Sequence, residues 1–238
     1  EWFGLSGMPW LMFGGIAASF LLWLQLRDVS NGKHASESKA LPWRDVIKSL
    51  RPLLIPLAAL VMARSFMVTA LGTYLPILMR DQGASIWLAG AALTIFEIAG
   101  IVGALTGGSI SDRIGRRTVI VVSMLVTPLL MFAFLAVSGI LELVLLLALG
   151  FTALSVTPVL MAVIQEAAPK NRALATGIFL AMGIVMSSIT VVVLGAIGDT
   201  LGMQQAYIIS AIMSLVGLPI VFLLPNLNPG RKDGNISK

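Results

Sequence analysis

Two charged residues stand in the middle of long apolar segments, where charge is costly. Arg64 lies within the apolar run 53–79 and Glu97 within the run 86–110. A charged side chain at the centre of a bilayer costs about 2.5–3.5 kcal/mol on insertion scales, so each residue needs water, a ligand or an opposite charge nearby. A guanidinium suits an anionic ligand, and a carboxyl can take up and release a proton.

Two interpretations of this pair stay open on the sequence alone. In the first, Arg64 binds an anionic group of a transported substrate, and protonation of Glu97 is coupled to transport. In the second, the two charges form a permanent ion pair between consecutive antiparallel helices and only fix their packing. Small residues at helical spacing from Glu97, namely Gly90, Gly100 and Ala104, favour burial of its face against another helix.

Hydroxyl groups on the apolar segments are further candidates for a polar cavity. Thr73 and Tyr74 belong to the segment that carries Arg64, and Thr152, Ser155 and Thr157 belong to the segment 141–164. The alternative is structural, because Ser and Thr in membrane helices often donate to a carbonyl of the preceding turn. The sequence has no metal-ligand cluster and no nucleophile motif, so we predict neither an enzyme nor a metal or cofactor site.

The strongest charged motif lies between two apolar segments, from Gly108 to Arg117. Three arginines and an aspartate within six residues cannot lie in hydrocarbon, so this stretch must turn outside the bilayer. Basic residues in short loops are retained in the cytoplasm. We therefore predict a cytoplasmic hairpin whose functional residues are Gly108, Asp112, Arg113, Gly115, Arg116 and Arg117.

The composition places the chain in a membrane. Hydrophobic residues make up 58% of the 238 residues and charged residues only 11%, whereas about a quarter of a soluble domain is charged. The net charge of +5 comes from basic residues between the apolar runs, without the basic stripe of a nucleic-acid-binding protein. We predict contact with the lipid bilayer and none with nucleic acid. Because cysteine is absent, disulfides and thiolate metal sites are excluded.

Seven apolar segments have about the length that a bilayer-crossing helix requires. The predicted fold is an all-α membrane protein with spans at 10–26, 53–79, 86–110, 118–137, 141–164, 174–197 and 206–224. Fourteen of the sixteen Lys and Arg residues fall on one side of this arrangement, which the positive-inside rule assigns to the cytoplasm. Residues 1–9 are then a periplasmic loop and residues 225–238 a cytoplasmic tail.

The long polar connection at 27–52 is predicted to be a cytoplasmic loop. Within it, apolar residues recur at helical spacing from Leu41 to Leu50, which is typical of a helix lying in the membrane interface. One span, a long basic linker and six further spans are best explained as the end of one six-helix half joined to a second half at 53–224. We therefore expect a fragment, with the missing N-terminal half as its partner.

In this setting the hairpin, of the form G-x-x-x-D-R-x-G-R-R, resembles the loop motif of the major facilitator superfamily in its second-half copy. The loop with Pro169, Arg172 and Gly177 resembles the family's stretch between helices ten and eleven. The resemblance implies a 12-helix fold in which 10–26 is helix six and the later spans are helices seven to twelve. We interpret the hairpin as a cytoplasmic latch that stabilises one access state, with Asp112 near the N-terminus of the helix after Arg172.

Shorter motifs around Arg64, Tyr74 and Glu97 resemble bacterial drug exporters of the fosmidomycin-resistance type. That resemblance implies a secondary active transporter of the bacterial inner membrane, with a cytoplasmic C-terminus. It would export a small anionic or amphiphilic drug in exchange for protons by alternating access. Helices seven and ten would line the cavity, and eight and eleven would pack against the other half. Two alternatives stay open: a proton-coupled uptake symporter for organic anions, and a non-transporting membrane receptor or scaffold.

Overall fold

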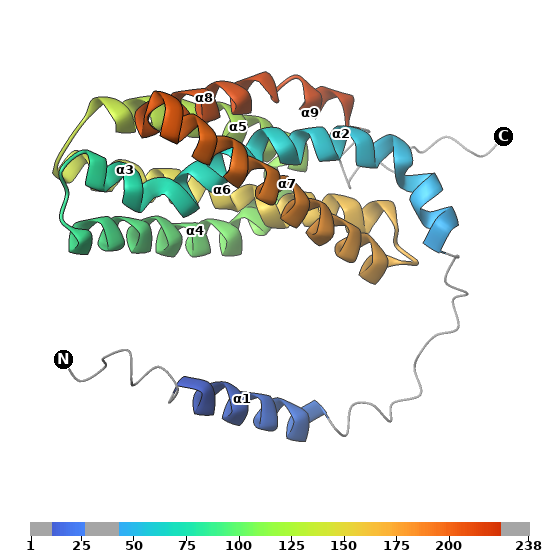
Figure 1. Cartoon of the computed structure of the whole chain (residues 1–238). Coiled ribbons are helices and arrows are strands. Elements are labelled where there is room, and N and C mark those ends of the chain that lie inside the picture. The colour runs from blue at the N-terminus through green and yellow to red at the C-terminus, as the bar shows by residue number, and fades with distance from the viewer. Residues whose placement is uncertain (1–10, 27–42, 225–238) are drawn as a thin grey trace. The chain divides into compact units, whose positions relative to one another are not determined.

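The computed structural model describes residues 11–26 and 43–224, and it contains helices and turns but no strand in these ranges. The elements are α1 (Leu11–Leu26), α2 (Trp43–Thr69), the π-helix η3 (Ala70–Tyr74), α3 (Leu75–Asp81), α4 (Ile86–Ile114), α5 (Arg116–Ala136), α6 (Ile140–Ala167), α7 (Arg172–Leu201), α8 (Met203–Val216) and α9 (Ile220–Leu223). The chain divides into two units, one with α1 and one with the remaining helices (Figure 1). The predicted all-helical membrane fold is confirmed.

The first unit is a single apolar helix. α1 has 16 residues, and its described side chains are all exposed, including Phe20 and Trp23, whose ring centroids lie 6.0 Å apart. A helix of this length measures about 24 Å, somewhat less than the hydrocarbon core of a bilayer. The predicted first span is therefore present as a helix, and it is shorter than the other six.

The second unit is a bundle with six stretches that are long and apolar enough to cross a membrane. Figure 1 shows these helices lying side by side, with α7 crossing the others obliquely. The stretches are Leu50–Asp81, Ile86–Ile114, Arg116–Ala136, Ile140–Ala167, Arg172–Leu201 and Met203–Leu223. Each contains or overlaps one of the spans predicted from the apolar runs.

The predicted hairpin from Gly108 to Arg117 is almost entirely helical in the structure, which corrects the sequence-based expectation. α4 continues to Ile114 and α5 begins at Arg116. The turn is confined to Gly115, whose φ of +93° favours glycine strongly. Hydropathy marks where a helix leaves the hydrocarbon, but polar residues continue an α-helix until a residue such as glycine ends it.

Other connections differ from the predicted ones for the same reason. The connection between the predicted spans 174–197 and 206–224 is reduced to Gly202, with φ of +91°, between α7 and α8. The loop predicted at 165–173 is a turn at 168–171. The last predicted span is divided by a turn at 217–219 into α8 and α9.

The segment predicted as an interfacial helix is the beginning of α2. This helix starts at Trp43 and continues through Pro52 and Pro56 into the membrane span. Figure 1 shows its first turns set at an angle to the rest. Proline removes a backbone donor and displaces the carbonyl four residues earlier, which bends a helix without ending it. The interfacial position of these turns stays a prediction.

Glycines bring α4 and α6 into backbone contact. A Cβ atom at Gly103 would overlap the carbonyl oxygen of Phe151, and one at Gly107 would overlap the carbonyl oxygen of Ser155. Both contacts advance along the two chains in the same direction, so the helices run parallel. Within a bilayer, close van der Waals packing of small residues replaces the hydrophobic effect as the force between helices.

Buried apolar side chains form two clusters at different depths of the bundle. One contains residues near the predicted cytoplasmic ends, including Leu57, Ile120 and Leu160. The other contains residues near the opposite ends, including Phe96 and Tyr207. Between them lies a layer with polar side chains, which positions the site described next.

A test of the α4–α6 contact compares two substitutions on α4. Gly103→Val should lower the free energy of unfolding by about 1–3 kcal/mol, because its side chain has no room beside Phe151. Gly90→Ala is the matched control, since no atom lies within 4 Å of the added Cβ. Equilibrium unfolding of the purified full-length protein measures both. Equal stability of the two variants would contradict the close contact.

Candidate functional site

A layer of polar groups separates the two apolar clusters at the middle of the bundle. Along α2, Ala63 belongs to one cluster and Phe66 to the other, so Arg64 lies at the boundary. Along α6, the boundary falls between Ala153 and Val156. We call this the Arg64 layer; its members are Arg64, Ser123, Thr127, Thr157, Ser214 and the carbonyl of Ala153.

Arg64 is half-buried and is held by α6. Its Nη2 donates to the carbonyl oxygen of Ala153 and to Thr157 Oγ1 at 2.8 Å. Pro158 follows Thr157 directly, and its missing N–H leaves the carbonyl of Leu154, next to Ala153, without its usual helical donor. The other guanidinium nitrogens, Nε and Nη1, have no partner among the described residues and are not buried. They can therefore donate to a ligand.

Hydroxyl groups from neighbouring helices surround this guanidinium. A cavity of about 10 Å³, enough for roughly one water molecule, is lined by Arg64, Ser123, Thr127 and Ser214 together with apolar side chains. Ser123 Oγ donates to the carbonyl oxygen of Thr152 at 2.5 Å and lies 3.5 Å from Thr127 Oγ1. Side chains of α2, α5 and α8 thus meet α6 in one polar cavity.

Glu97 lies apart from this layer. Its side chain is exposed on α4, and within the described ranges it forms no hydrogen bond or ion pair. A Cβ atom added at Gly72 would lie 3.8 Å from Glu97 Oε1, so the carboxylate lies beside the π-helix η3. The structure therefore does not bring Arg64 and Glu97 together as an ion pair: the guanidinium contacts α6 instead.

The hydroxyl candidates have partners inside the bundle. Tyr74 donates to the carbonyl oxygen of Val191 on α7 at 2.7 Å. Thr152 donates to the carbonyl of Ala148 in its own helix at 2.9 Å, and buried Ser155 donates to Thr152 at 3.0 Å. Thr152 contacts Ser123 of the Arg64 layer through its backbone oxygen and not through its hydroxyl. A contact of these three residues with substrate stays a prediction.

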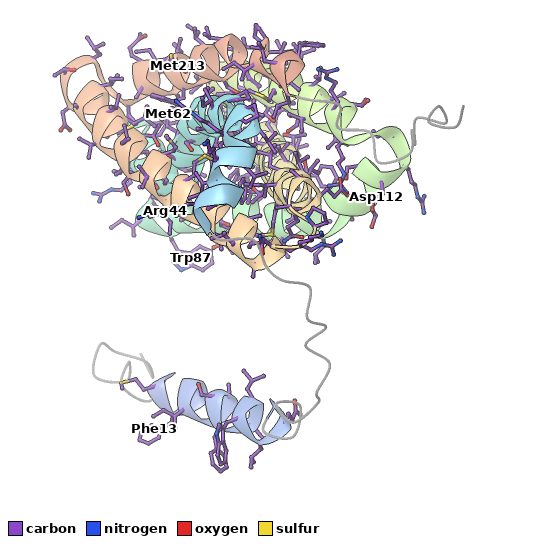
Figure 2. The ribbon with its side chains drawn as sticks, turned by 90° about the vertical axis from the view of Figure 1, so that its right-hand side faces the viewer. Phe13, Arg44, Met62, Trp87, Asp112 and Met213 are labelled. Carbon is purple, nitrogen blue, oxygen red and sulfur yellow. The ribbon has the colours of Figure 1, made fainter. Side chains whose placement is uncertain are left out.

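Arg116 is the centre of a charge cluster at the predicted cytoplasmic end. Its side chain is 7% exposed; Nη2 lies 2.5 Å from Glu166 Oε1 and 3.5 Å from Asp112 Oδ1. Nε and Nη1 are buried without a protein partner in the described residues. Figure 2 shows Asp112 at the surface of the bundle, where its side chain is 66% exposed. Asp112 forms its ion pair with Arg116, and its predicted position near the N-terminus of α7 stays a prediction.

Arg117 binds the end of the last helix. Its Nη2 donates to the carbonyl oxygen of Phe222 at 2.8 Å and, more weakly, to those of Val221 and Leu224. The guanidinium also lies 5.3 Å from the centre of the Phe222 ring. A cation stabilises the open carbonyls at a helix C-terminus. Arg117 therefore has a structural role: it holds the end of α9 against α5.

The remaining motif residues lie at the surface or in turns. Arg113 and Arg172 are exposed, and Gly108 is an ordinary helical residue with room for a side chain. Pro169 lies in the turn between α6 and α7, and Gly177 is exposed on α7. Gln165 Nε2 donates to Thr176 Oγ1 at 2.9 Å and ties the two helices beside this turn.

A second cavity lies at the opposite ends of the helices. It has a volume of about 440 Å³ and is lined by Gln82, Ser138 and Glu142 with apolar residues. Glu142 is 8% exposed and lies in the first turn of α6, where the helix N-terminus favours a carboxylate. None of its lining residues belongs to the Arg64 layer. Within the described residues, no group of acidic or histidine side chains could hold a metal ion.

Several residues of these sites were not predicted. Ser123, Thr127 and Ser214 resemble the many hydroxyls that bond only to their own helix, although the spacing of Ser123 and Thr127 beside Pro128 was a weak signal. Glu166 was assigned to a loop, and nothing local identified it as the partner of Arg116. Both omissions concern contacts between helices, which a single sequence does not reveal.

Comparison with known proteins identifies the family. The sequence model of the Major Facilitator Superfamily matches residues 57–238. The Fosmidomycin resistance protein of Escherichia coli (strain K12) is 28% identical over 236 residues, with 94% of this chain and 56% of that protein covered. The Uncharacterized MFS-type transporter YfnC of Bacillus subtilis (strain 168) is 28% identical over 148 residues, with 62% and 36% covered. The chain thus spans about half the length of the first relative and less of the second.

The charge cluster gives a prediction about stability. Glu166→Gln should lower the free energy of unfolding by about 1–3 kcal/mol, because it leaves the buried Arg116 without its close charged partner. Asp112→Asn should cost less than about 1 kcal/mol, because that pair is longer and largely exposed. Thermal or denaturant unfolding of the purified full-length protein measures both. A larger loss in Asp112→Asn would show that Asp112 is the principal partner, and equal losses would contradict the assignment of that role to Glu166.

Proposed function

Because this chain belongs to the major facilitator superfamily, we propose that it is the second half of a proton-coupled exporter of a small anionic drug. The coarser statement, a multi-pass membrane protein of a transporter family, follows from the family match and the six long apolar helices. The observation that supports the finer proposal is Arg64: a guanidinium in the middle of the bundle, held on one side by α6 and open on the other.

The fixed guanidinium explains why the substrate is proposed to be an anion. Arginine stays charged in the membrane, and its planar donors match the oxygens of a phosphonate or carboxylate. Because Nη2 is bound to Ala153 and Thr157, the side chain keeps its orientation while Nε and Nη1 remain free to donate. A relative whose name refers to fosmidomycin, a phosphonate, supports that substrate class. We therefore propose a fosmidomycin-like compound.

Glu97 is proposed to exchange the proton. Its carboxyl is exposed on a membrane helix and has no ion-pair partner among the described residues, so protonation relieves the cost of a charge in hydrocarbon. The helix that carries it, α4, packs directly on α6, which holds Arg64. Proton and substrate can thus act on one pair of helices. The proposed location is the bacterial inner membrane, with the C-terminus in the cytoplasm.

Alternating access requires a first half, which we propose as the partner of this chain. α4 and α7 are the least buried of the six spans, with 33% and 17% of their apolar windows buried in the bundle. Their exposed apolar faces support packing against that half. The cluster of Asp112, Arg116 and Glu166 is proposed to stabilise one access state at the cytoplasmic side.

Removal of Arg64 tests the substrate site. In cells that make the full-length protein, Arg64→Ala should abolish fosmidomycin resistance, and in proteoliposomes it should raise the KM at least about tenfold, since a charged hydrogen bond is lost. Ser65→Ala is the matched control and should leave resistance unchanged, because it removes a hydroxyl next to Arg64 that bonds only to Val61 of its own helix. Unchanged resistance in Arg64→Ala, at normal protein level, would remove Arg64 from the mechanism.

The coupling role of Glu97 gives a separate prediction. Glu97→Gln should abolish proton movement driven by fosmidomycin in vesicles, measured with a pH-sensitive dye, because the amide cannot release a proton. Glu142→Gln is the control, since that carboxyl also lies on a membrane helix but lines the second cavity. Normal proton movement in Glu97→Gln would return this residue to a packing role.

A further inference from the structure

The π-helix η3 interrupts the span that carries Arg64. It comprises the five residues Ala70–Tyr74, between α2 and α3. Pro76 lies in the first turn of α3, and in a continuous α-helix its ring would clash with the carbonyl of Gly72. The wider π-turn displaces that carbonyl. Single π-turns are rare and are frequently found at functional sites, which makes the contacts of this one worth following.

Two tyrosine hydrogen bonds tie η3 to the neighbouring helices α7 and α8. Tyr207 of α8 is fully buried and donates to the carbonyl oxygen of Ala70 at 2.5 Å. At the other end, the Tyr74 hydroxyl donates to Val191 of α7 at 2.7 Å. The π-turn is therefore tied at its first and its last residue, each time by a tyrosine hydroxyl bound to a backbone carbonyl.

The middle of η3 faces Glu97. Gly72 has no side chain, and the space where its Cβ would stand lies 3.8 Å from Glu97 Oε1. The backbone of η3 is thus the protein surface beside this carboxyl. Tyr207 binds the carbonyl of Ala70, two residues before Gly72, and so helps to fix the position of the backbone beside Glu97.

We propose that Tyr207 is a positioning residue for proton coupling, acting through η3 on the carboxyl of Glu97. This inference rests on the proposed function of Glu97. Tyr207 itself has no access to substrate or solvent, because it is buried in the bundle and its hydroxyl is bound to Ala70. Loss of that hydroxyl should loosen η3, displace the surface beside Glu97 and slow the coupled step. It should leave anion binding at Arg64 unchanged.

The test removes the buried hydroxyl of Tyr207 and compares this variant with a matched control on the same helix. Tyr207→Phe removes the bond to η3, whereas Ser210→Ala removes an equally buried hydroxyl that bonds only within α8. In the full-length protein, hydrogen exchange of the amides in η3 should become about fivefold faster in Tyr207→Phe alone, the effect of one hydrogen bond. In proteoliposomes, the maximal rate of proton-driven fosmidomycin transport should fall about fivefold at unchanged KM.

A second pair of variants changes Gly72, the residue of η3 that lies beside Glu97. Gly72→Leu should also lower the maximal rate at unchanged KM, because its side chain would displace the carboxyl. Gly72→Ala should transport normally, since its added Cβ would make only an ordinary contact. Fosmidomycin counterflow, which needs no net proton movement, should be no slower in Tyr207→Phe with Glu97→Gln than in Glu97→Gln alone.

Three results would overturn the proposal: exchange in η3 that is unchanged in Tyr207→Phe, faster exchange with normal transport, or counterflow losses that multiply in the double variant. Failure of the proposed function has a different signature, namely normal proton movement in Glu97→Gln. The exchange measurement distinguishes the two, because it reports on η3 whatever the role of Glu97.

Discussion

Hydrogen bonding without water is the constraint on which the rest of this bundle depends. In hydrocarbon, a polar group must find its partner within the protein, and four side chains here find it in a backbone carbonyl of another helix. Arg64 binds Ala153, Ser123 binds Thr152, Tyr74 binds Val191 and Tyr207 binds Ala70. Two of these bonds, those of Tyr74 and Tyr207, involve the π-helix η3.

The order and approximate position of the helices could be predicted from the sequence, because long apolar runs separated by basic connections leave few alternatives. Helix ends could not be predicted equally well. The polar residues after Gly107 still form helix until Gly115, and the loop expected before Met203 is only Gly202. The π-helix was not expected either, since its cause, Pro76 following Gly72, reads locally as the end of a span.

The candidate site, too, could be predicted from the sequence only in part. Arg64 and Glu97 were recognisable because single charges in apolar runs are costly. Their partners were not, because these come from residues about 90 positions away in the case of Arg64 and Thr157. A hydroxyl that bonds across helices has the same sequence signature as one that bonds to its own helix, as Ser123 and Thr152 illustrate. The hydrogen-bond partners of these side chains can therefore be identified only from the three-dimensional structure.

The glycine contact between α4 and α6 has a mechanical consequence. Two parallel helices whose backbones interlock cannot slide or rotate against each other without steric overlap, so we expect them to behave as one stiff body. Glu97 belongs to α4, and the turn that holds Arg64 belongs to α6. The proposed coupling of these two groups then needs no chain of polar side chains, because a displacement of one helix of a stiff pair is a displacement of both.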